Sequence, residues 1–221
     1  MPPKTANPAK PRPRSEERLF LTIVLCLAAV AGLGSWFAAS ALAHRDQLHG
    51  ISPDKPRQLV EFALTGADGH TVTRADLDGK ILVVSFLFTS CSLTCPEVSK
   101  RMAEIQRRTA NDPDVRLLSL TVDPRTDSPA ALAKWGARFG ADTNRWFLLT
   151  GQKSVLYNLI GTSFLPTDSD DPFNSMPGNF SGTERIAVVD RHGHTRVFYD
   201  GLRSETPSAV VAEIERLRHE P

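Results

Sequence analysis

Apolar residues occur along this chain in runs that predict strands and helices in alternation. Residues 80–88 form an apolar run rich in β-branched side chains, which is typical of a strand buried on both faces. Two similar runs, 114–123 and 145–151, predict two further strands. Between and after these runs, apolar residues spaced along one helix face, together with capping and stop signals, predict helices. The predicted helices cover 95–109, 128–140, 152–161 and 206–219.

Two hairpins complete the predicted domain. Residues 58–73 contain two short apolar segments around a Gly-Ala-Asp-Gly turn, and segments 184–190 and 195–201 flank an Arg-His-Gly-His turn. Strands that alternate with helices imply right-handed βαβ crossovers and a mainly parallel sheet, to which the last hairpin adds an antiparallel part. We therefore predict one α/β domain over residues 58–221, with a mixed, mainly parallel central sheet.

The first part of the chain follows a different pattern. Residues 19–43 are uncharged and mostly apolar, and they exceed the roughly 20 residues that cross a hydrocarbon core. Residues 1–18 are basic and proline-rich, with too few apolar side chains to fold, so we predict a disordered tail. Residues 44–57 are interpreted as a polar tether between this transmembrane anchor and the domain.

The basic tail also predicts the orientation of the protein. The positive-inside rule keeps residues 1–18 in the cytoplasm, which makes this a single-pass protein of the inner cell membrane with its domain on the periplasmic or extracytoplasmic side. Cleavage by signal peptidase after Ala43 is the alternative, but the apolar span is longer than the usual core of a signal peptide. Cys26, inside the span, is interpreted as an inert buried thiol.

Charge adds an exclusion. The formal net charge is +1, and no cluster of basic residues occurs in the domain. Proteins that bind nucleic acid present a basic patch or stripe, so nothing here predicts a nucleic-acid partner.

The other two cysteines, Cys91 and Cys95, lie where the 80–88 strand passes into the next helix. Ligands of open α/β sheets bind at such junctions, beyond the carboxyl ends of the strands. Thr94 and Glu97 have the spacing of a capping box, which would make Cys95 the first helical residue. A helix N-terminus stabilises a thiolate, so we expect the pKa of Cys95 to be lowered.

Three chemistries suit two thiols at this spacing. They can form a reversible, redox-active disulfide, they can bind Cu(I), which selects soft sulfur ligands, or one can attack a peroxide. Two incidental thiols are disfavoured, because unpaired cysteines are a liability in an exported domain. The peroxidase is disfavoured because Phe88 and Ser92 stand three residues before the two cysteines, where a peroxidatic cysteine has threonine.

Two stretches carry a resemblance to a known family. "FLFTSCSLTCPEVSKRMAEIQ" and "LLSLTVDPRTDSPAALAKWGARFGADTNRWFLLTG" resemble the Sco/SenC family of copper-handling, thioredoxin-like proteins. The resemblance implies a thioredoxin-like fold, an N-terminal anchor, copper bound by Cys91 and Cys95, and a role in building the dinuclear copper centre of cytochrome c oxidase. Asp123 matches the aspartate of the family's Val-Asp-Pro segment, which we expect near the copper ligands without binding the metal.

The chain departs from the family at the third copper ligand. The resemblance places Gly182 where the family has a histidine. Met176, in the loop that leads to this position, is a candidate thioether ligand for Cu(I), with packing as the alternative. His192 and His194 sit at the turn of the last hairpin, about six residues along the strand from its Gly182 end. At roughly 3.4 Å per residue this is about 20 Å, so we interpret both as solvated turn residues.

Two functions follow from this reading. The first is a copper-binding assembly factor, a carrier of Cu(I) rather than an enzyme. It would deliver copper to, or prepare the thiols of, the copper-centre subunit of cytochrome c oxidase or another cuproprotein. The second is a thiol–disulfide oxidoreductase without stable copper binding. Loss of the histidine weakens Cu(II) binding and leaves disulfide exchange untouched.

Overall fold

The computed structural model describes residues 50, 52–53, 57–164 and 183–220. The chain divides into two compact units, Met1–Gln47 and Leu48–Pro221, and the division falls within the predicted tether. The predicted tail and anchor lie outside the described residues, as do Met176 and Gly182. Within the described ranges, no helix is both long and apolar enough to span a bilayer.

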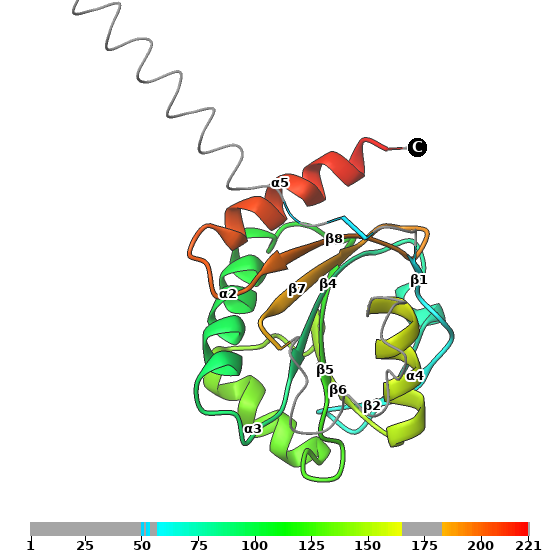
Figure 1. The fold of residues 1–221 in the computed structure, drawn as a ribbon, viewed down its shortest axis with the longest axis vertical. Helices are drawn as coiled ribbons and strands as arrows, with labels where there is room; N and C mark the ends of the chain where they lie inside the picture. Colours follow the sequence, from blue (N-terminus) through cyan, green and yellow to red (C-terminus); the bar gives the residue numbers. More distant parts are fainter. Residues whose placement is uncertain (1–49, 51, 54–56, 165–182, 221) are drawn as a thin grey trace, which may run out of the picture. The chain divides into compact units, whose positions relative to one another are not determined.

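A mixed sheet forms the centre of the second unit (Figure 1). In the described residues it contains eight strands in the spatial order β1-β8-β7-β4-β5-β6-β2-β3. Their bounds are β1 Arg57–Gln58, β2 Ala63–Gly66, β3 Thr71–Thr73, β4 Ile81–Leu87, β5 Val115–Thr121, β6 Trp146–Thr150, β7 Arg185–Val189 and β8 His194–Asp200.

The prediction of a mainly parallel sheet is wrong for these strands. β4 pairs in parallel with β5, and β5 with β6, whereas the other neighbouring pairs are antiparallel. Both predicted hairpins are confirmed, as β2–β3 and β7–β8. Short turns join only antiparallel strands, so each hairpin adds antiparallel pairs beside the parallel centre. Arg57, assigned to the tether from sequence, already belongs to β1.

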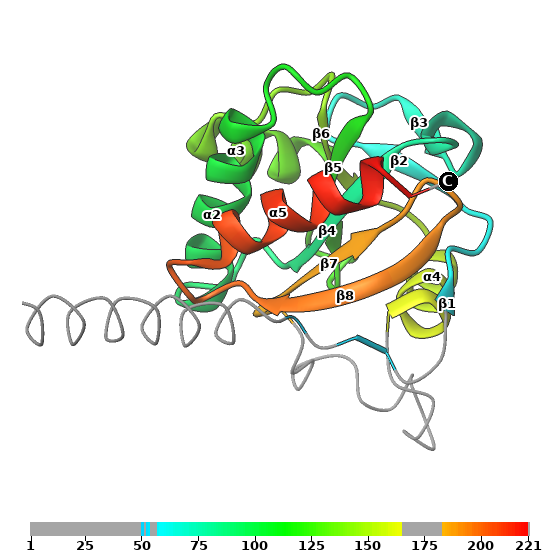
Figure 2. The same cartoon turned by 90° about the horizontal axis from the view of Figure 1, so that it is seen from above.

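Helices cover both faces of the sheet. Their bounds are α2 Thr94–Arg108, α3 Pro129–Phe139, α4 Lys153–Phe164 and α5 Thr206–Arg218, with a short 3-10 turn, η1, at Ala75–Leu77. Figures 1 and 2 show α2, α3 and α5 on one face and α4 on the other. This arrangement gives the central strands two buried faces, as the apolar run of 80–88 predicts.

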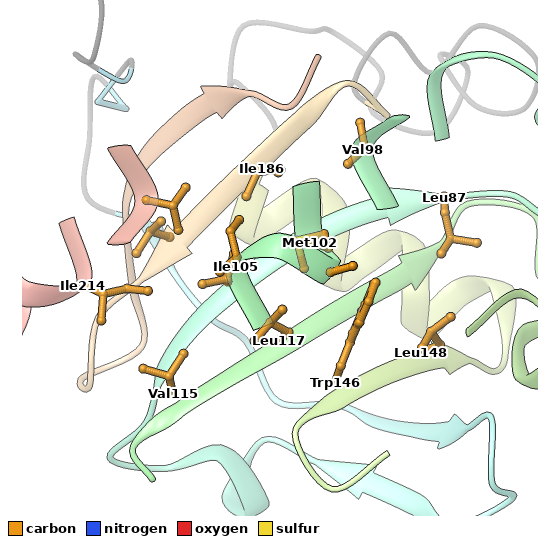
Figure 3. Packing of buried hydrophobic residues seen from close by; sticks show 14 of the residues in the cluster. Leu87, Val98, Met102, Ile105, Val115, Leu117, Trp146, Leu148, Ile186 and Ile214 are labelled. Carbon is orange, nitrogen blue, oxygen red and sulfur yellow. The ribbon is translucent and has the colours of Figure 1, made fainter. Parts of the chain in front are cut away.

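Alternate residues of β4 divide the hydrophobic core into two clusters. Val84 and Phe86 pack with α4, whereas Val83 and Leu87 face α2, α3 and α5. Figure 3 shows the second cluster, in which Met102 and Ile105 of α2 lie against Leu117 and Trp146 of the sheet. The core therefore fixes α2, the helix that follows the two cysteines.

Helix ends test the stop signals in the sequence. α3 begins as predicted, with the Ser128 hydroxyl accepting the N–H of Ala131 at 3.3 Å, and ends at Gly140, whose φ of 68° suits glycine. The predicted end of α4 at Gly161 is wrong, since the helix continues to Phe164. Phe164 packs edge-on against Phe86 with ring centroids 5.5 Å apart, and this burial outweighs the weak helix propensity of glycine.

Candidate functional site

Cys91 and Cys95 lie where β4 ends and α2 begins, at the edge of the sheet that receives the carboxyl ends of the parallel strands. Both are free thiols. Cys95 is 1% exposed and belongs to the core cluster that also contains Val98 and Met102 (Figure 3). Cys91 is half-buried and packs against the margin of that cluster. The pair therefore has one accessible and one enclosed thiol.

The start of α2 differs from the prediction. Leu93 is the N-cap residue and makes no side-chain cap hydrogen bond, so Thr94 is the first helical residue and the predicted capping box is wrong. The Glu97 carboxylate pairs with Lys100 at 2.6 Å instead. The backbone N–H of Cys95 donates to Sγ of Cys91 at 3.1 Å. Sulfur thus takes the place that a hydroxyl usually holds at a helix N-terminus.

The electrostatics of Cys95 also reverse the prediction. Burial, and next the adjacent thiol of Cys91, raise the pKa of Cys95 to about 12. The backbone N–H of Phe88 and the hydroxyl of Thr183 act in the opposite direction without offsetting the burial. Desolvation of the charged form therefore outweighs the helix dipole at this buried position. Cys95 is a protonated thiol at neutral pH in the metal-free protein.

The start of the last hairpin, which includes Thr183, lies near the cysteines. Thr183 is 6% exposed, lies just before β7, and its hydroxyl acts to lower the pKa of the Cys95 thiol. β7 runs antiparallel beside β4 with Ile186 opposite Ser85, so its beginning lies at the same edge as the end of β4. Gly182, outside the described residues, directly precedes Thr183 in the sequence.

A fully buried carboxylate holds the start of the cysteine loop. Asp127 is 0% exposed and accepts the backbone N–H of Thr89 at 3.1 Å and 3.2 Å. It also accepts the hydroxyls of Thr89 and Thr121, each at 2.5 Å. Sequence reasoning missed this residue, because an aspartate one position before a helix N-cap gives no signal that separates a buried acceptor from a turn residue.

Asp123, the aspartate singled out from sequence, is half-buried two residues beyond β5. Its backbone N–H donates to the Thr121 hydroxyl at 2.9 Å, which connects it to Asp127. Burial raises the pKa of Tyr157, and the charge of Asp123 adds to this rise. The expected role of Asp123 beside the copper ligands stays a prediction.

The aromatic residues nearest the cysteine loop and the two histidines occupy different parts of the domain. Phe164 is a core residue, and Phe88 is half-buried between the two clusters. His192 lies on the β7–β8 turn and His194 is the first residue of β8, both next to the start of β4, whereas the cysteines follow its end. His192 is exposed and the His194 side chain is 42% exposed. His192 is a solvated turn residue, as predicted, whereas the prediction of a turn residue is wrong for His194, which pairs with Gln58 of β1.

The donor set suits a soft metal ion. In the described part of the chain, no group of three or more histidine, cysteine, aspartate or glutamate residues could hold a metal ion. The adjacent thiols of Cys91 and Cys95 nevertheless supply two soft donors, which select Cu(I) over hard cations. Met176, the candidate third ligand, and Gly182, which stands where the family has its histidine, fall outside the described residues.

Comparison with models of protein families identifies the family of this chain. The model of the family described as SCO1/SenC matches residues 52–219, which is most of the chain and nearly all of its second unit. The chain belongs to the SCO1/SenC family. The match includes the cysteine loop, the Thr89–Thr121–Asp127 contacts and the hairpin that begins near Thr183.

Curated relatives are consistent with this membership. The chain is 28% identical over 159 residues to the SCO1 protein homolog of Bacillus subtilis, a match that covers 69% of this chain and 82% of the relative. It is 29% identical over 143 residues to the mitochondrial SCO1 homolog of Homo sapiens, covering 62% of this chain and 46% of that one. The match thus spans about half the length of the human relative.

Solved structures share the fold. A SCO1/SenC family lipoprotein from Bacillus anthracis has a TM-score of 0.62 at 27% identity, covering 76% of this chain and 100% of the other. Yeast Sco1, solved with copper bound, has a TM-score of 0.58 at 20% identity, covering 76% and 96%. BsSco, a member of the Sco family of cytochrome c oxidase assembly proteins with an identified disulfide switch, has a TM-score of 0.63 at 22% identity, covering 78% and 99%.

Proposed function

We propose that this protein is a membrane-anchored copper carrier that holds Cu(I) between Cys91 and Cys95 and delivers it to the dinuclear copper centre of cytochrome c oxidase. The observation that carries the proposal is the position of Cys91 Sγ at the start of α2, where it accepts the backbone N–H of Cys95, in a SCO1/SenC chain. Related proteins of this fold have been solved with copper bound, which supports the choice of cargo.

The unequal exposure of the thiols suggests how the cargo is handled. Cys91 is the ligand that a donor or acceptor protein reaches, and Cys95 closes the buried side of the site. Metal ligands must be deprotonated, so loading displaces the proton that Cys95 holds at neutral pH. Exchange through Cys91 lets copper pass to another dithiol without opening the core.

Anaerobic titration of the reduced full-length protein in detergent tests this proposal. The protein carries Cys26→Ser, so that only the site cysteines remain. We expect one Cu(I) per chain in this background, and loss of tight binding in Cys91→Ser and in Cys95→Ser, because each removes one of two soft ligands. A reduced protein that binds no Cu(I) would overturn the proposal.

The third ligand is the finer part of the proposal. We expect Cu(II) to bind weakly because Gly182 supplies no imidazole, and Met176 to complete the Cu(I) site through its thioether. Gly182 directly precedes Thr183 in the sequence, and the resemblance places the family's histidine at Gly182.

Gly182→His should therefore raise Cu(II) affinity by about tenfold or more and produce a thiolate-to-copper charge-transfer band. Arg107→His is the matched control, because it adds the same imidazole at an exposed position in the last turn of α2, at the end of that helix away from the cysteines. Equal gains in the two variants would show that the imidazole acts elsewhere. Met176→Ala should weaken Cu(I) binding, and unchanged affinity would assign Met176 to packing.

A thiol–disulfide reductase is the second candidate, and the asymmetry of the pair favours it. The accessible Cys91 thiolate can attack a partner disulfide, forming a mixed disulfide and releasing one partner thiol. Cys95, after losing its proton, then attacks Cys91 Sγ and releases the second partner thiol. The protein ends as the Cys91–Cys95 disulfide, having given two electrons and two protons to the partner.

The predicted anchor determines the compartment in which the cysteine site acts. We propose that residues 19–43 hold the chain in the inner membrane and that the domain lies on the periplasmic or extracytoplasmic side. The uncharged span and the basic residues before it support this proposal.

A further inference from the structure

We infer that Asp127 is a positioning residue: its buried carboxylate clamps the start of the cysteine loop and thereby sets both the stability of the Cys91–Cys95 disulfide and the affinity of the pair for a soft metal ion. The copper part of this inference rests on the proposed function, and the disulfide part does not.

Asp127 forms hydrogen bonds with residues at the ends of two neighbouring strands, and we call this set of contacts the clamp. Three donors surround the carboxylate: the N–H and hydroxyl of Thr89, which follows β4, and the hydroxyl of Thr121, which ends β5. Two hydroxyls and one backbone N–H thus converge on a carboxylate that is 0% exposed. A carboxylate has two acceptor oxygens, whereas an amide has one and turns its NH2 group toward at least one of these donors.

The clamp acts on the half of the loop that holds the accessible thiol. Cys95 is fixed by the core cluster, on the helix side of the loop. On the strand side, Thr89 is held by Asp127, and Cys91 follows two residues later with its N–H donating to the Phe88 carbonyl at 3.0 Å. Ser92 and Leu93, between the cysteines, are exposed, Leu93 at 80%. The position of Cys91 Sγ relative to Cys95 therefore depends on the hold at Thr89.

Fixed relative position matters for both chemistries of the pair. A disulfide has specific geometry, and two thiols held close to it have a high effective concentration for each other. A metal ion that binds both sulfurs gains from the same preorganisation. Releasing Thr89 should lower both quantities together. The disulfide should become easier to reduce, and Cu(I) should bind less tightly.

A second buried carboxylate provides a matched control. Asp190, 6% exposed, accepts the N–H groups of His192 and His194 at 2.9 Å and pairs with Arg196 at 3.0 Å. It follows β7, where Val189 lies opposite Leu82 near the start of β4. Asp190→Asn therefore damages a comparable network at the end of β4 away from the cysteines.

The experiment compares Asp127→Asn with Asp190→Asn in the full-length Cys26→Ser protein. The Cys91–Cys95 equilibrium is measured by thiol alkylation in glutathione buffers, Cu(I) affinity by competition with a chromophoric chelator, and stability by urea unfolding. For Asp127→Asn we expect a disulfide about tenfold less stable, a rise of about 30 mV in reduction potential, together with weaker Cu(I) binding. For Asp190→Asn we expect both site properties within about twofold of the parent, despite lower stability.

Thr89→Val provides a milder variant, because it removes one hydroxyl contact and keeps the backbone N–H and the side-chain volume. It should shift the disulfide equilibrium in the same direction by a smaller factor, and it serves alone if Asp127→Asn does not fold. Unchanged equilibrium in folded variants of the clamp, or equal changes in Asp190→Asn, would overturn the inference. If the parent protein binds no Cu(I), the proposed function fails while the disulfide equilibrium still tests the clamp.

Discussion

At the scale of single residues, the two cysteines differ because one lies on an exposed loop and the other in the core. Cys91 accepts a backbone N–H at the start of α2, whereas Cys95 is enclosed by apolar side chains and keeps its proton to about pH 12. The raised pKa means that the thiolate form of Cys95 is rare at neutral pH. Below the pKa, the thiolate fraction increases about tenfold for each unit by which the pH rises. The two thiols should therefore react at different rates.

Alkylation of the reduced Cys26→Ser protein checks this difference. At neutral pH we expect Cys91 to be modified first, and Cys91→Ser to leave Cys95 at least about tenfold slower than it is in urea. The rate at Cys95 should keep rising as the pH increases, because deprotonation limits it. Cys95→Ser should leave the rapid reaction of Cys91 in place. Equal rates for the two thiols in the folded protein would contradict this assignment.

The sequence predicted that Cys91 and Cys95 lie together at a strand–helix junction, which the structure confirms, but it did not predict the groups around them. Asp127 and Thr183 act through contacts between residues far apart in the chain, with Thr89 and Cys95 respectively, and no local pattern marks such contacts. The expected pKa of Cys95 was wrong for the same reason, since its burial depends on the packing of α2.

At the scale of elements, α2 and α3 begin in different ways. α3 has a hydroxyl cap at Ser128, whereas α2 begins at the Cys91 sulfur and the Thr94 side chain makes no cap hydrogen bond. The capping-box pattern of Thr94 and Glu97 does not determine how α2 begins. The conformation of the preceding loop is set by the burial of Cys95 and by the contacts at Thr89.

Paired alanine substitutions test this difference. Ser128→Ala should lower the free energy of unfolding by about 1 kcal/mol, the usual effect of removing a hydroxyl cap. Thr94→Ala should change it by less than about 0.5 kcal/mol, because no cap is lost. Urea unfolding of the reduced protein measures both values. A larger loss for Thr94→Ala than for Ser128→Ala would restore the capping box.

Most of the element order followed from hydrophobic periodicity, since buried strands and one-sided helices leave direct patterns in a sequence. The antiparallel pairing of β4 with β7 and of β6 with β2 did not, because an apolar run on a doubly covered strand looks the same in parallel and antiparallel pairs. The length of α4 was also missed. Its last turn is stabilised by Phe164 against Phe86, a contact between distant residues.

At the scale of the whole molecule, we propose a protein with a membrane anchor at its N-terminus and an exported domain that carries copper. A reporter enzyme that is active only outside the cytoplasm, fused after Pro221, should be active in cells. Residues 19–43 should also keep the protein in washed membranes, because a span of this length is held by the hydrocarbon core. Activity of a cytoplasm-specific reporter in its place would contradict the topology, and release of the domain would indicate cleavage after Ala43.

The central claim is that Cys91 and Cys95 carry copper to a client protein, and that they do not act by reducing a disulfide of that client. The direct test mixes the reduced, Cu(I)-loaded protein with the soluble copper-centre domain of a cytochrome c oxidase subunit, and then measures copper and thiol oxidation in each protein. One portion of the client is supplied as the dithiol and another as the disulfide. We predict that copper moves to the dithiol client, that Cys91 and Cys95 remain reduced, and that the disulfide client is left oxidised. Reduction of the disulfide client, with a Cys91–Cys95 disulfide formed and no copper transferred to either form, would contradict the carrier and support the reductase.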